Sequence, residues 1–182
     1  MNYVYHGSTK QNLTEIKPKK NDLIYATKDK IICALFIRNT KTGHGSFSRS
    51  FGHEKNIPFV VERYKNALED MYDEVSGSIY ILDSQSFFED KLKWQMVSQK
   101  PVQVIEEIKI DNVKNFLIDL EKQKLLKIYR YPEKPKCIPA DDTDLVKEVL
   151  KFNSLKKLYE FKQLFPDLYL EHKDALHNII KQ

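Results

Sequence analysis

The sequence predicts an α+β domain, with two packed sheets around a cleft and flanking helices, followed by a helical C-terminal extension. Three observations lead to this prediction. Short segments with strand character recur between residues 3 and 110. Residues 129–140 then contain three prolines, which a helix or a central strand does not tolerate. Beyond them, apolar residues recur at helical spacing. We therefore expect a main domain at 1–128, a linker at 129–140 and a helical extension at 141–182 that packs on the main domain.

Composition narrows the class of protein. A hydrophobic content of 41% in 182 residues supports one domain with a packed core. The net charge of +4 is too small to indicate a nucleic-acid-binding surface by itself. No apolar run approaches the roughly 20 residues of a membrane span, and the first residues lack the features of a signal peptide. With Cys33 and Cys137 as the only cysteines, we expect a cytoplasmic protein without a membrane partner.

Two polar side chains lie near the ends of the first two predicted strands. Residues 3–5 form a strand that is expected to deliver His6 onto a turn at residues 7–8. A second strand is expected at 23–26 and contains Tyr25. A histidine and a tyrosine near the ends of neighbouring strands can meet across a cleft, and that arrangement suits a nucleotide.

A helix and a long loop are expected next. Thr27 is predicted to cap the helix, with Asp29 in its first turn. Residues 38–56 hold three of the five glycines and are predicted to be a long, mobile loop. His44 and His53 lie in this segment, but cysteine or paired carboxylates at metal-ligand spacing are lacking nearby, so we expect no metal site.

Periodicity predicts the remaining elements. Strands are expected at 57–64, 77–83 and 102–110, a short helix or connection at 65–74, and a short helix at 86–93. Longer helices are expected at 112–126, 141–151, 154–165 and 167–181. In the strand at 102–110 the even positions are apolar except for Glu106. A carboxylate on an apolar strand face has either a functional role or a solvated position at an edge or bend.

The first motifs carry a family resemblance. YHGS at residues 5–8, followed by IYAT at 24–27, resembles the opening of the ADP-ribosyltransferase fold, in its diphtheria-toxin-like and poly-ADP-ribose-polymerase-like branch. The resemblance implies a split β-sandwich that binds NAD as a substrate. It implies that His6 hydrogen-bonds the adenosine ribose and that Tyr25 stacks on the nicotinamide ring. The remaining residues expected to contact NAD are Gly7, Ser8 and Thr27.

The same resemblance implies a glutamate beside the ribose. Cleavage of the nicotinamide bond passes through an oxocarbenium-like transition state, which a nearby negative charge stabilises. Relatives often carry this glutamate just before a segment like that at 97–102, and here Gln95 occupies the matching position. Glu106 is the alternative candidate.

Two classes of function follow, and a third is weaker. The chain is either an enzyme that transfers ADP-ribose from NAD to an acceptor protein or nucleic acid, or to water, or a weakly active or inactive module that binds a nucleotide or nucleic acid. The related RNA 2′-phosphotransferase reaction would need a cluster of basic residues that the sequence does not make evident. No glycine-rich phosphate loop, nucleophile elbow or zinc-protease motif competes with these readings.

Overall fold

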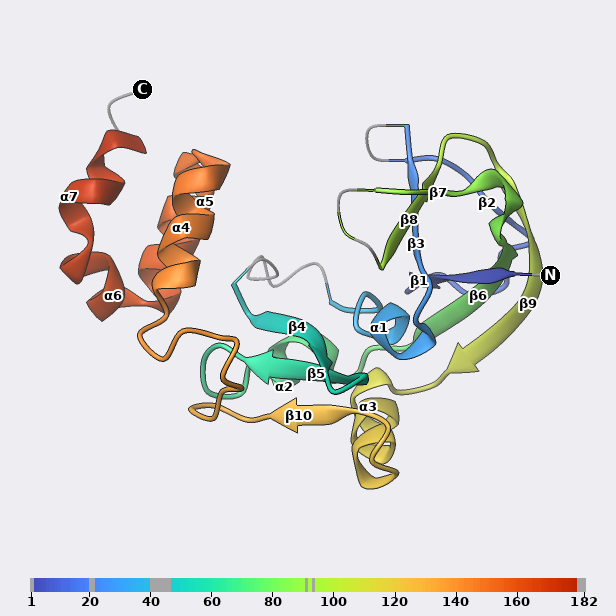
Figure 1. Cartoon of the computed structure of the whole chain (residues 1–182), viewed down its shortest axis with the longest axis horizontal. Coiled ribbons are helices and arrows are strands. Elements are labelled where there is room, and N and C mark those ends of the chain that lie inside the picture. Colours follow the sequence, from blue (N-terminus) through green and yellow to red (C-terminus); the bar gives the residue numbers. More distant parts are fainter. Residues whose placement is uncertain (1, 20–21, 40–46, 91, 93, 180–182) are drawn as a thin grey trace. The chain divides into compact units, whose positions relative to one another are not determined.

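The computed structural model describes residues 2–19, 22–39, 47–90, 92 and 94–179 (Figure 1). They form two compact units. The first comprises the described residues of Met1–Asn39, Phe51–Phe59 and Leu68–Lys127, and the second those of Thr40–Ser50, Val60–Ala67 and Ile128–Gln182. None of the helices in this described part has the length and apolar character needed to cross a bilayer.

A seven-stranded antiparallel sheet dominates the first unit (Figure 1). Its order is β2-β9-β6-β1-β3-β8-β7. The strands are β1 (Tyr3–Ser8), β2 (Glu15–Ile16), β3 (Ile24–Thr27), β6 (Gly77–Asp83), β7 (Phe88–Glu89), β8 (Gln95–Ser98) and β9 (Val102–Ile110). The consecutive neighbours β1, β3 and β8 carry His6, Tyr25 and Gln95, one on each strand.

One face of this sheet carries a hydrophobic core. Because side chains alternate along a strand, every second residue of β1, β3 and β6 points to the same side. The buried cluster on that side consists of Val4, Ile16, Ile24, Ala26, Tyr80, Leu82, Phe87, Met96 and Val102.

A β-bulge in β9 gives Glu106 the solvated position at a bend, one of the two alternatives that the sequence left open. Tyr80 lies opposite Glu107, but Leu82 lies opposite Val104, so β9 has one more residue than β6 in this stretch. The extra residue reverses the alternation. Glu106 pairs with Ile81, away from the face of Val104, and its side chain is exposed. The even positions of β9 therefore do not share one apolar face.

Helices and a second sheet complete the elements between residues 30 and 129. They are α1 (Lys30–Ala34), α2 (Ala67–Tyr72), the 3-10 helix η1 (Ser84–Ser86), α3 (Val113–Lys122), and a sheet ordered β10 (Lys127–Tyr129), β5 (Ile57–Glu62), β4 (Arg49–Glu54). The strand β4 falls inside the predicted loop 38–56, and where a helix is predicted at 86–93 the chain instead has the end of η1 at Ser86 and β7 at Phe88–Glu89. Both errors arise because strand pairing, not local sequence, decides these short segments.

The second unit contains a helical core. Its helices are α4 (Thr143–Phe152), α5 (Leu155–Leu164), α6 (Pro166–Glu171), α7 (Lys173–Leu176) and the 3-10 helix η2 (His177–Ile179). Pro166 begins α6 because its missing N–H is not needed at the first helical position. Instead of one helix at 167–181, the chain breaks at His172. The buried cluster includes Phe47, Leu145, Val146, Val149, Leu158, Phe161, Tyr169, Leu176 and Ile179.

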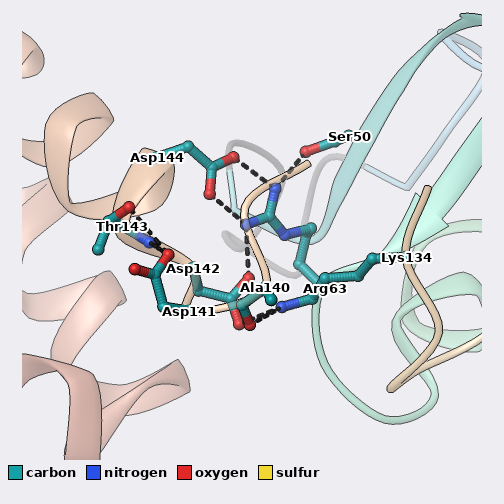
Figure 2. Close-up of polar contacts among 8 residues, drawn as sticks. All are labelled: Ser50, Arg63, Lys134, Ala140, Asp141, Asp142, Thr143 and Asp144. Carbon is teal, nitrogen blue, oxygen red and sulfur yellow. Dashed lines mark hydrogen bonds and ion pairs between the residues drawn. The ribbon is translucent and has the colours of Figure 1, made fainter. Parts of the chain in front are cut away.

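A buried arginine that directly follows β5 contacts two carboxylates at the start of α4 and the hydroxyl of Ser50, all within this unit (Figure 2). The Arg63 side chain is completely buried, and its guanidinium donates two hydrogen bonds of 2.7 Å to Asp144. It also donates to Asp142 and to the hydroxyl of Ser50, both over 2.6 Å. Lys134 contacts the second carboxylate oxygen of Asp142 at 2.7 Å. Burial would raise the pKa of Asp144, but its pairing with Arg63 outweighs that effect and lowers the pKa.

Candidate functional site

A pocket of about 370 Å³ lies at β1, β3 and β8 in the first unit. It is lined by Tyr5, His6, Gly7, Tyr25, Ala26, Thr27, Cys33, Phe36, Trp94 and Gln95. Five residues that the sequence singled out meet here, namely His6, Gly7, Tyr25, Thr27 and Gln95. Ser8 and Glu106 do not line this pocket.

Strand register brings three of the lining residues into one row. Tyr5 on β1 lies opposite Thr27 on β3, and Thr27 lies opposite Gln95 on β8. Directly paired residues of an antiparallel sheet project from the same face. Tyr25, two residues before Thr27 on the same strand, belongs to that face as well. Residues that are distant in sequence therefore form one wall.

His6 approaches the pocket from the other face. It pairs with Tyr80 of the core cluster, whereas Tyr25 alternates with the core residues Ile24 and Ala26. The two side chains thus do not face each other across a cleft as expected. The two residues are instead linked through the backbone of Tyr25. The imidazole Nδ1 of His6 donates to the Tyr25 carbonyl oxygen over 2.7 Å.

This hydrogen bond determines the chemistry of the imidazole ring. With Nδ1 as the donor, the neutral ring keeps Nε2 as an acceptor. Burial lowers the pKa of His6, and Lys19 acts in the same direction, while the bond to Tyr25 opposes them. The net lowering keeps the ring neutral near pH 7. His6 can therefore accept a hydrogen bond from a ligand hydroxyl.

Gly7 allows the end of α1 to pack closely on β1. A Cβ at this position would lie 2.7 Å from the carbonyl oxygen of Cys33 and 2.9 Å from Cγ1 of Ile37. The strand continues through Ser8, so the turn predicted at residues 7–8 is wrong. The Ser8 hydroxyl accepts a hydrogen bond from the backbone N–H of Lys10 over 3.1 Å.

Asp29, not Thr27, caps α1. Its Oδ1 accepts from the backbone N–H groups of Ile31 and Ile32 over 2.7 and 3.0 Å. Thr27 is buried, and its hydroxyl accepts from the backbone N–H of Asp29 over 3.0 Å. The other carboxylate oxygen of Asp29 lies 2.8 Å from Nε2 of His53 on β4. Thr27 therefore shapes the pocket by holding the turn into the helix.

Gln95 is oriented by a carboxylate that sequence reasoning missed. Its Nε2 donates to Oδ2 of the half-buried Asp90 over 2.8 Å, and the backbone N–H of Asp90 donates to the Gln95 carbonyl over 3.1 Å. Because a carboxylate only accepts hydrogen bonds, the amide nitrogen must face Asp90. The amide oxygen is left as the acceptor that Gln95 offers to a ligand.

Glu107 is a second carboxylate that the alternation pattern did not single out. One of its oxygens accepts from the hydroxyls of Ser78 and Tyr80 over 2.6 and 3.1 Å and from the N–H of Asn12 over 2.8 Å. The bond from Ser78, followed by that from Asn12, lowers the pKa of Glu107. Glu107 does not line the pocket, and we assign it to holding the chain near Asn12 against the sheet.

The aromatic wall was also missed. Phe36, Phe51 and Trp94 contact one another, with ring centroids 5.4 Å apart for the two pairs involving Phe51 and 6.0 Å apart for Phe36 and Trp94. Phe36 and Trp94 line the pocket and Phe51 packs behind them. The available sequence signal was an unexplained tryptophan directly before Gln95.

No protein-family model, curated protein or solved structure matches the chain. Among the described residues, no group of three or more His, Cys, Asp or Glu side chains could hold a metal ion. His44 lies outside the described residues, as does most of the predicted loop's first half.

Proposed function

We propose that this pocket binds NAD, and that the chain is an ADP-ribosyltransferase-like protein that transfers ADP-ribose to an acceptor protein or nucleic acid at a low rate. One observation carries the proposal. The motif residues His6, Gly7 and Tyr25 line a single pocket together with Gln95, which comes from a third strand about 70 residues further along the chain.

The size and lining of the pocket support a ligand with a flat ring. Its volume of about 370 Å³ lies within the range of small-molecule sites, about 300–1,000 Å³. Tyr25 keeps 37% of its surface exposed, which leaves a ring available for stacking. Tyr5 also lines two adjacent pockets of about 650 and 600 Å³, so a dinucleotide has further surface over which to extend.

Three pocket residues have a specific role in this proposal. His6 accepts a hydrogen bond from a ribose hydroxyl through Nε2, and Tyr25 stacks on the nicotinamide ring. The Gln95 amide oxygen lies toward the ribose and offers a partial negative charge to the developing oxocarbenium ion. Bond cleavage releases neutral nicotinamide, and the ribose carbon is taken by a nucleophilic oxygen or nitrogen of the acceptor, or by water.

Because Gln95 has a neutral amide, we expect slow cleavage of the nicotinamide bond. None of the described lining residues is an aspartate or a glutamate. Removing one electrostatic contact to a transition state costs about 10²–10³ in rate. The same observation favours the second candidate function, a nucleotide-binding module that has kept the pocket and lost catalysis.

Two measurements on the purified full-length chain separate these functions. Calorimetric titration with NAD tests whether the pocket binds it, and release of nicotinamide under saturating NAD tests for chemistry. Binding with slow release supports the transferase, and binding without release supports the module. Absence of NAD binding at millimolar concentration would refute both NAD-based proposals.

A further inference from the structure

Three aromatic rings that line the pocket come from separate elements of the first unit. Tyr25 belongs to β3, Phe36 follows α1, and Trp94 precedes β8. Phe51 of β4 supports the last two from behind, in edge-to-face contact with each at interplanar angles of 84° and 67°. This packing fixes the orientation of Trp94 before any ligand arrives.

Two of these rings are exposed. Phe36 keeps 42% of its surface accessible and Tyr25 keeps 37%. Both line the same pocket as Trp94. Exposed rings gathered around one concave site are a feature of ligand recognition, whereas isolated exposed rings carry no such meaning.

The lack of charge among the lining residues is a second observation about the ligand that would fit. None of the described lining residues is Asp, Glu, Lys or Arg, and the one titratable base among them, His6, has a lowered pKa and is neutral near pH 7. A positively charged ligand group in this pocket would therefore lie against aromatic rings, without repulsion from a charged side chain among the described lining residues. Aromatic faces carry negative potential and attract cations within about 6 Å, most strongly for tryptophan.

We propose that Phe36 and Trp94 make the pocket selective for a flat ring that carries a positive charge, such as an N-alkylated pyridinium. The inference rests on the proposed function, because the oxidised nicotinamide ring of NAD is such a cation. It goes further by assigning selectivity for ring charge to two residues outside the motifs. The reduced dinucleotide has the same phosphates, riboses and adenine, but its nicotinamide ring is neutral.

The test compares matched cationic and neutral ligands. Calorimetry on the full chain measures dissociation constants for NAD and NADH, and separately for 1-methylnicotinamide and nicotinamide. A cation–π contact predicts that the cationic member of each pair binds about 2- to 30-fold more tightly. Trp94→Leu should remove most of this ratio while NADH binding changes little, and Trp94→Phe should retain part of it.

Two further variants distinguish a local effect in the pocket from a folding defect. Phe36→Leu alters the wall at its exposed ring and should also reduce the ratio. Phe152→Leu, on an exposed ring of α4 that lines neither this pocket nor the two adjacent ones, should leave the ratio unchanged. Equal affinity for both members of each pair, or an unchanged ratio in both wall variants, overturns charge selectivity while NAD binding stands. Failure of all four ligands to bind overturns the proposed function together with this inference.

Discussion

The imidazole of His6 and the carbonyl oxygen of Tyr25 are joined by a hydrogen bond of 2.7 Å between two neighbouring strands. The contact ties the two motif residues together although their side chains emerge on opposite faces of the sheet. It also sets the tautomer of the imidazole, and therefore which nitrogen can serve a ligand. Loss of either residue should consequently change binding in a distinguishable way.

Replacement of the two motif residues should separate the two halves of NAD. His6→Ala should weaken NAD and ADP-ribose alike, by about 1–3 kcal/mol, because the acceptor for a ribose hydroxyl is lost. Tyr25→Ala should weaken NAD more than ADP-ribose, which lacks the nicotinamide ring. Calorimetry with both ligands measures the difference, and equal losses for both ligands in Tyr25→Ala would exclude the stacking role.

Restoring a carboxylate at Gln95 should speed release of nicotinamide, but Asp90 complicates the simple substitution. Gln95→Glu alone places a second carboxylate about where the 2.8 Å hydrogen bond now lies, and like charges at that separation raise a pKa and favour protonation of one of them. We therefore expect Gln95→Glu combined with Asp90→Asn to exceed Gln95→Glu alone and to approach a gain of about 10²–10³ over wild type.

The controls for that experiment are Asp90→Asn alone and Glu106→Gln. The first should not speed the reaction, because the charge at position 95 is still missing. The second should leave the rate unchanged, because Glu106 is exposed and outside the pocket. Fast release by the wild type that disappears in Glu106→Gln would instead assign the catalytic role to Glu106.

Stability should fall with acid in a way that depends on His6. Its pKa is lowered in the folded chain, so the folded state binds fewer protons than the unfolded state below about pH 6.5. This contribution to stability is present above pH 6.5 and is lost as the pH falls through the lowered pKa. NMR titration of the ring should show a pKa below 6.5. Urea unfolding of His6→Gln should show a weaker pH dependence in that window, and an identical dependence would refute the assignment.

Neutralising the partners of Arg63 should destabilise the second unit. Asp142→Asn combined with Asp144→Asn leaves a fully buried guanidinium without its counter-charges, which costs about 3–5 kcal/mol. Urea unfolding followed by circular dichroism measures the loss. Asp119→Asn, which removes an exposed ion pair with Lys122, is the control and should change stability far less. Similar losses in both variants would contradict the role of the buried network.

The sequence could predict the residues of the site better than their geometry. The family resemblance selected His6, Tyr25 and Gln95, which line one pocket, and the sequence pattern located the central strands β6 and β9. Alternation could not reveal the bulge in β9, because an extra residue becomes apparent only when β6 is paired with it. For that reason the single apolar face predicted for the even positions of β9 is wrong.

The supporting residues of the site depend on tertiary contacts in the same way. Asp90 meets Gln95 because β7 and β8 pair, and Phe51 reaches Trp94 because residues 49–54 form a strand within a predicted loop. Short strands of two to six residues carry little propensity of their own, so their partners decide them. The ADP-ribosyltransferase fold and NAD binding stay predictions that rest on the motifs and the pocket.

Calorimetric titration of NAD into the wild-type chain tests the central proposal most directly, with His6→Ala as the pocket variant and Tyr159→Ala as a control. Tyr159 is 64% exposed in the second unit and does not line the pocket. The account predicts saturable binding by the wild type and the control, weakened by about 1–3 kcal/mol in His6→Ala. No binding by the wild type at millimolar NAD, or equal binding by all three chains, would contradict it.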